Sequence, residues 1–138
     1  MDISHCFSLK MRQANRVLTG HYDAYLKEQG ITVAQFSIMR SLWYMKSTSQ
    51  KELQEVLVLQ QTTLTRNLKL LIRDGYVRTT ISHEDARVNL VTLTEEGKAL
   101  FLEAQKEWKK AQLNLSSQLG EDLSKQLLTV ADAIIELA

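Results

Sequence analysis

Hydroxyl and cationic side chains recur along one side of the segment Gln60–Asp74, at Thr62, Arg66, Lys69 and Arg73. If the segment is a helix, these four side chains share one arc and the opposite arc is apolar. The apolar positions are Leu64, Leu68, Leu71 and Ile72. A helix that buries leucines and exposes hydrogen-bond donors is suited to enter a groove of DNA, but an ordinary surface helix with solvated charges has the same pattern. The neighbouring segments must distinguish the two.

The chemistry of each side chain on this arc sets what it could contact in a groove. Arg66 alone can donate two hydrogen bonds to guanine O6 and N7, worth about 1–3 kcal/mol of discrimination between bases. Thr62 and Thr63, at the helix start, could bond a phosphate or a base, or touch a thymine methyl group. Lys69 and Arg73 are better suited to the phosphate backbone. We therefore expect the first two turns to read bases.

A short capped helix precedes this segment. Ser49 is a favourable N-cap, and Glu52 three residues later completes the pattern of a capping box. Two short helices joined by a turn of three or four residues form a helix-turn-helix, whose second helix reads the groove. The start of the first helix, at Ser49, Gln50 and Lys51, offers N–H groups and a lysine to a phosphate.

After Gly75 the period of the sequence changes. Residues 76–82 are rich in β-branched and aromatic side chains, residues 88–94 are mostly apolar, and the stretch 83–87 between them is polar. This predicts a β-hairpin, and a hairpin that follows a helix-turn-helix is the wing of a winged helix. A residue within 47–49 could pair as a short further strand.

Long helices are expected on either side of this module, at residues 3–28, from Thr32 to about Lys46, from Thr94 to about Gln118, and near the C-terminus. The last one carries a heptad-like apolar seam. The first helix and the last two expose more apolar surface than the central module can cover. We predict a dimer interface made of both chain ends; packing only within one domain is the alternative.

Composition is that of one globular domain. The 138 residues are 44% hydrophobic, with no proline and five glycines, which favours long helices with few breaks. The net charge is +1, but residues 1–90 hold twelve Lys and Arg against eight Asp and Glu, whereas residues 91–138 hold five against eight. This asymmetry suits one face for a polyanion. No segment resembles a membrane span or a signal peptide, so we expect a cytoplasmic protein with no membrane partner.

Motifs of enzymes and metal proteins are missing from the sequence. One cysteine excludes an internal disulfide framework, and there is no CxxC or HExxH motif. There is also no glycine-rich phosphate loop and no nucleophile elbow, so we expect no catalysis, cofactor or metal. A winged helix can instead serve purely as a protein-interaction module, which would have no salt-dependent affinity for DNA.

Residues 85–97 carry the most specific pattern of the chain: Asp85-Ala86-Arg87, a strand ending in Leu93-Thr94, and Gly97 in the next helix. With Thr63-Leu64-Thr65-Arg66 and the order of elements, this pattern resembles the MarR family of bacterial transcription regulators over almost the whole chain. The resemblance implies a mainly α fold, a winged helix-turn-helix with a two- to three-stranded wing flanked by N- and C-terminal dimerisation helices. It implies a single domain, residues 1–138, with the DNA-binding module at about 30–97 and dimerisation helices at about 1–28 and 98–138.

The same resemblance implies a homodimer that binds double-stranded DNA at a pseudo-palindromic operator, usually as a repressor. Thr65 would belong to the recognition helix, and Arg87 at the wing tip would enter the minor groove. Asp85 would orient an arginine, with a purely local hairpin salt bridge as the alternative. Relatives commonly carry an acidic or small cap and then an arginine where this chain has Gln60-Gln61. Glutamine is a poor N-cap, and Gln61 could bond an adenine edge, so we expect a different operator.

Release from DNA in this family often follows binding of a small aromatic or lipophilic molecule, or oxidation of a cysteine. An apolar wall with a cation nearby could hold an aromatic carboxylate, although an aromatic stripe is also ordinary core. The candidate ligand residues are Met11, Arg16, His21, Phe36, Met39 and Trp43. Cys6 is the candidate redox residue if its pKa is lowered and it is exposed; otherwise it is a buried hydrophobe.

Overall fold

The computed structural model describes residues 3–138, so residues 1 and 2 of the expected N-terminal dimerisation segment lie outside the described residues. The elements are η1 (Ile3–His5), α1 (Phe7–Leu26), η2 (Lys27–Gln29), α2 (Val33–Met45), β1 (Ser47–Ser49), α3 (Gln50–Leu57), α4 (Gln61–Arg73), β2 (Val77–Ile81), β3 (Asn89–Leu93), α5 (Glu95–Leu119) and α6 (Glu121–Ile135). None of these helices is long and apolar enough to cross a membrane.

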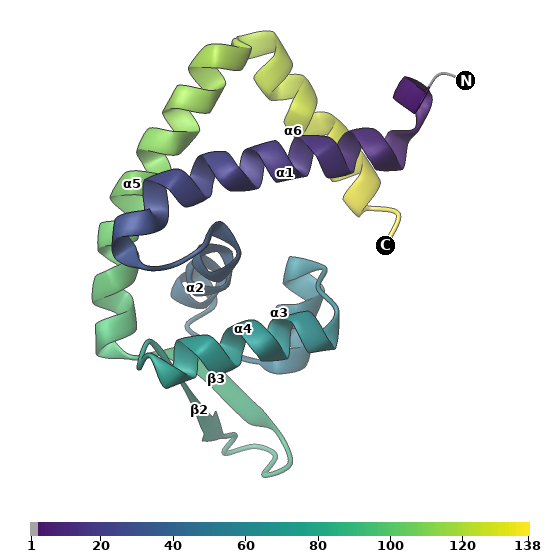
Figure 1. Ribbon diagram of the computed structural model, residues 1–138. Coiled ribbons are helices and arrows are strands. Elements are labelled where there is room, and N and C mark those ends of the chain that lie inside the picture. Colours follow the sequence, from purple (N-terminus) through teal and green to yellow (C-terminus); the bar gives the residue numbers. More distant parts are fainter. Residues whose placement is uncertain (1–2) are drawn as a thin grey trace.

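A winged helix-turn-helix occupies the lower part of the molecule in Figure 1, where α4 lies beside the β2–β3 hairpin. The three strands are antiparallel in the order β1-β3-β2, with Thr48 and Thr79 opposite Val91 on its two sides. Helix α1 crosses above α2, and α5 and α6 meet at an angle above α1. The predicted fold class, a mainly α winged helix with flanking helices, is confirmed.

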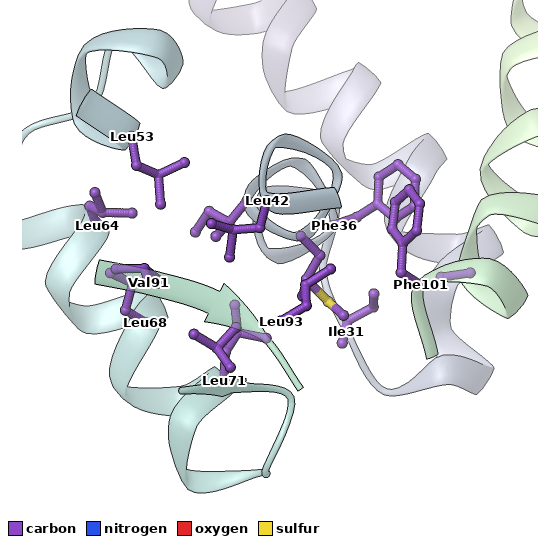
Figure 2. Packing of buried hydrophobic residues seen from close by; sticks show 14 of the residues in the cluster. Ile31, Phe36, Leu42, Leu53, Leu64, Leu68, Leu71, Val91, Leu93 and Phe101 are labelled. Carbon is purple, nitrogen blue, oxygen red and sulfur yellow. The ribbon is translucent and has the colours of Figure 1, made fainter. Parts of the chain in front are cut away.

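The leucines of α4 anchor it to the core. Leu64, Leu68 and Leu71 are buried, and they meet Leu53 of α3 and Val91 of β3 (Figure 2). Each buried leucine contributes about 1.5–3 kcal/mol, so this stripe holds the polar arc outward. Ile72, which the pattern also placed on the stripe, is 42% exposed; it lies at the edge of the apolar arc, near the helix end.

The predicted helix starts are formed, with one difference. Thr32 and Gln35 make a full capping box, with hydrogen bonds of 3.2 and 3.1 Å. Ser49 accepts from the Glu52 N–H at 3.1 Å, but the Glu52 carboxylate accepts from the Thr48 hydroxyl at 2.8 Å. The second capping box is therefore only half formed. Thr48 is buried in β1, and its hydroxyl needs a partner there.

The first helix is shorter than the predicted span of 3–28. Cys6 has an extended backbone and separates η1 from α1. Its Sγ atom accepts from the Leu9 N–H at 3.5 Å, so Cys6 caps α1 instead of lying within it. At the other end, Gly30 takes the left-handed conformation (φ 73°). Asp23 then accepts from the Val33 N–H at 2.7 Å and ties α1 to the start of α2.

Large apolar side chains of α1, α5 and α6 remain exposed within one chain. Phe7 is 88%, Val17 73% and Leu113 70% exposed. An apolar groove of about 560 Å³ runs between these helices. It is lined by Ala14, Val17, Leu18, Leu115, Leu119, Leu123, Gln126, Leu127 and Val130. Apolar surface of this extent is typical of an interface with another chain.

Candidate DNA-binding surface

The polar arc of α4 lies on the surface, as the helical spacing predicts. Gln61, Thr62, Arg66 and Lys69 are exposed. Gln60 is the N-cap, and its side chain makes no capping hydrogen bond. The first N–H groups of α4 are thus not satisfied by a cap and can donate to a phosphate or to water. Thr63 and Thr65 are half-buried, at the border with the core.

The last turn of α4 carries a paired arginine. Arg73 donates from Nε to the carboxylate of the next residue, Asp74, at 3.0 Å, and both side chains are exposed. The hydrogen bond with Asp74, and its charge, raise the pKa of Arg73. Sequence reasoning assigned Arg73 to the phosphate backbone, but it did not predict the pair between Arg73 and Asp74. An arginine whose positive charge is offset by a neighbouring carboxylate attracts phosphate less strongly than Arg66 and Lys69, which form no ion pair within residues 3–138.

The start of α3 contributes one exposed cation and one internal contact. Lys51 is exposed beside the capped N-terminus. Gln50, by contrast, donates from Nε2 to the hydroxyl of Thr65 at 2.8 Å. Two residues expected to face DNA therefore contact each other. Their positions are 15 residues apart, so no local pattern predicts the pair.

The wing tip is a braced turn. Asp85 Oδ1 accepts from the Arg87 N–H at 3.0 Å and from its Nε at 3.1 Å, and Oδ2 accepts from Nη2 at 3.2 Å. The hydrogen bonds from the Arg87 side chain and backbone lower the pKa of Asp85. The Arg87 side chain is 90% exposed. Asp85 and Arg87 thus form a salt bridge within the hairpin. This geometry is the one that the local alternative describes, and it is also compatible with a role of Asp85 in orienting Arg87.

A cleft of about 660 Å³ lies between the start of α3 and the wing. Its lining brings Ser49, Gln50 and Lys51 together with Asp85 and Arg87. In Figure 1 the β2–β3 hairpin extends below α4, so that α3, α4 and the hairpin lie at the same end of the molecule. Side chains from α3, α4 and the wing are therefore available to one elongated partner.

One threonine joins the end of α4 to the start of α5. The Thr94 hydroxyl donates to the Gly75 carbonyl oxygen at 2.6 Å and accepts from the Gly97 N–H at 3.0 Å. The Thr94 N–H donates to the Tyr76 carbonyl oxygen at 3.1 Å. The helix start at Thr94 is predictable from the sequence, but its link to the end of α4 is not, since its partner Gly75 is 19 residues away.

The six candidate ligand residues do not share one cavity. Met39 and Phe36 are buried in the core. Trp43 packs on Phe101, with ring centroids 5.1 Å apart. His21 donates from Nε2 to the Ala111 carbonyl oxygen at 3.0 Å. The two remaining residues, Met11 and Arg16, lie exposed on α1.

Phe36 lines a cavity whose wall also contains Arg40, a residue that sequence reasoning did not single out. This cavity of about 430 Å³ lies between α2, α3 and α5. The Arg40 guanidinium carbon lies 5.0 Å from the ring centroid of Trp108 and 5.5 Å from that of Tyr44. A cation between aromatic faces, with Val56 and Leu57 completing the wall, suits an anionic aromatic molecule.

Cys6 is exposed and its thiol is free. The expectation of a buried hydrophobe does not hold within one chain, because the backbone leaves the helix at this residue. Exposure is one of the two conditions for a redox role.

Comparisons with known proteins agree with this geometry. The model of the MarR family matches residues 31–88, which run from just before α2 to the turn between β2 and β3. The chain is 35% identical to the organic hydroperoxide resistance transcriptional regulator of Bacillus subtilis over 131 residues, which cover 95% of this chain and 86% of the relative.

Solved structures of DNA complexes share the fold. The transcriptional regulator MOSR of M. tuberculosis in complex with DNA has 30% sequence identity and a TM-score of 0.82, covering 94% of this chain and 96% of that one. A MarR variant from E. coli in complex with operator DNA has 25% identity and a TM-score of 0.84, covering 92% and 91%. This chain belongs to the MarR family of winged-helix, DNA-binding transcriptional regulators.

Proposed function

We propose that this protein is a homodimeric repressor that binds a pseudo-palindromic operator in double-stranded DNA and is released by a small aromatic or lipophilic anion. The observation that carries the proposal is the exposed arc of Thr62, Arg66 and Lys69 on α4, together with the exposed Arg87 that pairs with Asp85 at the wing tip. The arc would enter the major groove, while Arg87 would enter the adjacent minor groove. The DNA-binding module would comprise residues of about 30–97.

Two copies would join through the chain ends, at residues of about 1–28 and 98–138. The support is the exposed apolar groove of α1, α5 and α6, including Val17, Leu123 and Leu127. Burying such a face against a second copy is favourable at about 25 cal/mol per Å². A two-fold dimer would present two recognition helices about 34–36 Å apart, one turn of DNA.

The effector would enter the cavity beside Arg40. Its carboxylate would pair with the guanidinium, and its ring would lie against Trp108 and Tyr44. Helix α3 forms one wall through Val56 and Leu57, so an occupant would act directly on the helix-turn-helix. Titration of the protein–DNA complex with a small aromatic carboxylate such as salicylate tests this role. Release by the wild type but not by Arg40→Ala is expected, whereas equal release from both proteins would exclude it.

Oxidation of Cys6 is a second candidate trigger, favoured by its exposure and by the similarity to a regulator named for organic hydroperoxide resistance. A hydroperoxide would convert the thiol to a sulfenic acid and leave as the alcohol. Mass spectrometry after mild treatment with cumene hydroperoxide, read beside DNA affinity, decides it. Modification without any change in affinity would remove Cys6 as a switch.

The test of DNA binding is a fluorescence anisotropy titration at two salt concentrations. The probes are duplexes from the region upstream of the gene and scrambled duplexes of equal length. We expect tighter binding to one upstream duplex, with an affinity that falls steeply as salt rises. Each phosphate that a lysine or arginine neutralises releases a counterion from the DNA, which steepens the dependence of affinity on salt. A protein-interaction module would bind neither duplex in a salt-dependent way.

A further inference from the structure

We propose that Gln50 and Thr65 act together as a positioning brace that sets the orientation of the first turns of α4, and that they contribute to operator discrimination through Arg66 instead of through contacts of their own. The observation is the 2.8 Å hydrogen bond from Gln50 Nε2 to Thr65 Oγ1. The role in DNA reading rests on the proposed function, whereas the brace itself belongs to the protein without DNA.

The connection between α3 and α4 is closed by backbone hydrogen bonds from the Val58 and Leu59 N–H groups to the carbonyl oxygens of Glu55 and Gln54, at 3.2 and 3.1 Å, but it contains a strained residue. Val58, at the end of α3, has φ 53° and ψ 46°, a left-handed conformation that β-branched residues rarely adopt. Gln60 then starts α4 without a side-chain cap. A strained turn followed by a start without a side-chain cap gives the first turn of α4 fewer hydrogen bonds than a capped helix start has.

Among residues 3–138, the Gln50–Thr65 bond is the one side-chain hydrogen bond between α3 and α4. It joins the first residue of α3 to the second turn of α4, beyond the strained Val58. On the core side, Leu53 of α3 and Leu64 of α4 hold the same two helices together (Figure 2). The buried leucines resist separation and fix which side of α4 faces the core, but apolar contacts are not directional and restrict small rotations of the helix less sharply than a hydrogen bond does. A hydrogen bond at the edge of the interface restricts that rotation.

Arg66 directly follows Thr65 in α4. Bidentate contact with guanine requires both N–H groups of the guanidinium to be aligned, so a small rotation of the helix is enough to lose it. A phosphate contact from Lys69 tolerates such a rotation, because an ammonium group is a point charge on a flexible stem. Loss of the brace should therefore lower discrimination between sequences more than overall affinity.

The first test uses DNA-free protein and amide hydrogen exchange. Thr65→Val removes the hydroxyl and keeps the branched shape, while Thr65→Ser keeps the hydroxyl. In Thr65→Val and Gln50→Ala, protection of the amides at residues 64–68 should fall by about three- to tenfold, the range for loss of one hydrogen bond. Thr65→Ser should retain it. Unchanged protection in Thr65→Val would overturn the brace, whatever the protein does with DNA.

The second test measures affinity for a duplex that the wild-type protein selects from a random library, and for a scrambled duplex. Both single variants should lose about three- to tenfold on the selected duplex only, and the double variant should lose no more than either single one. Losses that multiply in the double variant would mean two independent DNA contacts and would contradict the proposal. Lys51→Ala, a direct phosphate contact, should instead weaken both duplexes and flatten the salt slope. If the wild type selects no duplex, the proposed function fails while the exchange test still judges the brace.

Discussion

A Cβ atom on Gly97 would lie 2.0 Å from the carbonyl oxygen of Tyr76. Gly97 is buried in the first turn of α5, and that carbonyl already accepts the Thr94 N–H. The close approach allows the start of α5 to pack on the backbone at Tyr76, just after α4. A backbone oxygen cannot rotate away as a side chain can, so any larger residue must separate the two segments.

We expect Gly97→Ala to lower the free energy of unfolding by roughly 3 kcal/mol, because the added methyl group would overlap the backbone atoms of Tyr76. Urea denaturation at one protein concentration measures it. Gly20→Ala is the matched control: Gly20 lies within α1 with no atom near its Cβ position, and the change should stabilise by about 0.5–1 kcal/mol. Equal effects of the two changes would contradict the packing described for Gly97.

At the start of α4, Gln60→Asp should stabilise the protein by about 0.5–2 kcal/mol, since it supplies the missing cap and a negative charge at a helix N-terminus. Gln60→Ala should have little effect, because the present side chain makes no capping bond. Thermal unfolding of both variants separates a capping effect from a general response to substitution. A loss of stability in Gln60→Asp would show that the glutamine has another role.

On α4, Arg66→Ala should abolish discrimination between the selected and the scrambled duplex, a loss of about 1–3 kcal/mol on the selected one alone. Lys69→Ala should weaken binding to both and reduce the salt slope by about one. Gel shifts with both duplexes at several salt concentrations give these quantities. Equal losses on both duplexes for Arg66→Ala would rule out base reading by this residue.

For the wing, the lowered pKa of Asp85 makes a pH prediction. The carboxylate is stabilised by Arg87, so its contribution to the hairpin is fully present above its ordinary pKa of 3.8 and is lost as pH falls through the lowered value. A carboxyl ¹³C NMR titration should give a midpoint below 3.8, moving back up in Arg87→Ala. Both members of the Asp85–Arg87 pair are thus charged throughout the neutral range. A midpoint unaffected by Arg87→Ala would contradict the pairing.

Within the apolar groove, Leu127→Glu should convert a dimer to a monomer, because a carboxylate cannot be buried there without a partner. Sedimentation velocity shows the change. Leu102→Glu, on an exposed position of α5 outside the groove, is the control and should leave the association unchanged. Dissociation by both variants would point to general destabilisation.

Local patterns in the sequence predicted the elements and the polar arc. The helix period, the helix starts at Thr32, Ser49 and Thr94, and the change of period after Gly75 each depend on residues a few positions apart. Contacts across long separations were not predictable in this way. Gln50 with Thr65, Thr94 with Gly75, and Arg40 with Trp108 are pairs that only the packed chain brings together. The break at Cys6 was missed because cysteine is rarely considered as a cap.

The Thr94 hydroxyl bonds both Gly75, just after α4, and Gly97, in the first turn of α5, so it forms a joint between the two helices. Helix α5 has 25 residues, which at 1.5 Å per residue give a lever of about 37 Å. A rotation of about 5° at the joint would displace the far end by roughly 3 Å over that length. Conversely, a small shift at the far end of α5 would reach the end of α4 as a change of angle between the two helices. The length of α5 would therefore turn a small change of angle at Thr94 into a displacement of several ångströms at the far end of the helix.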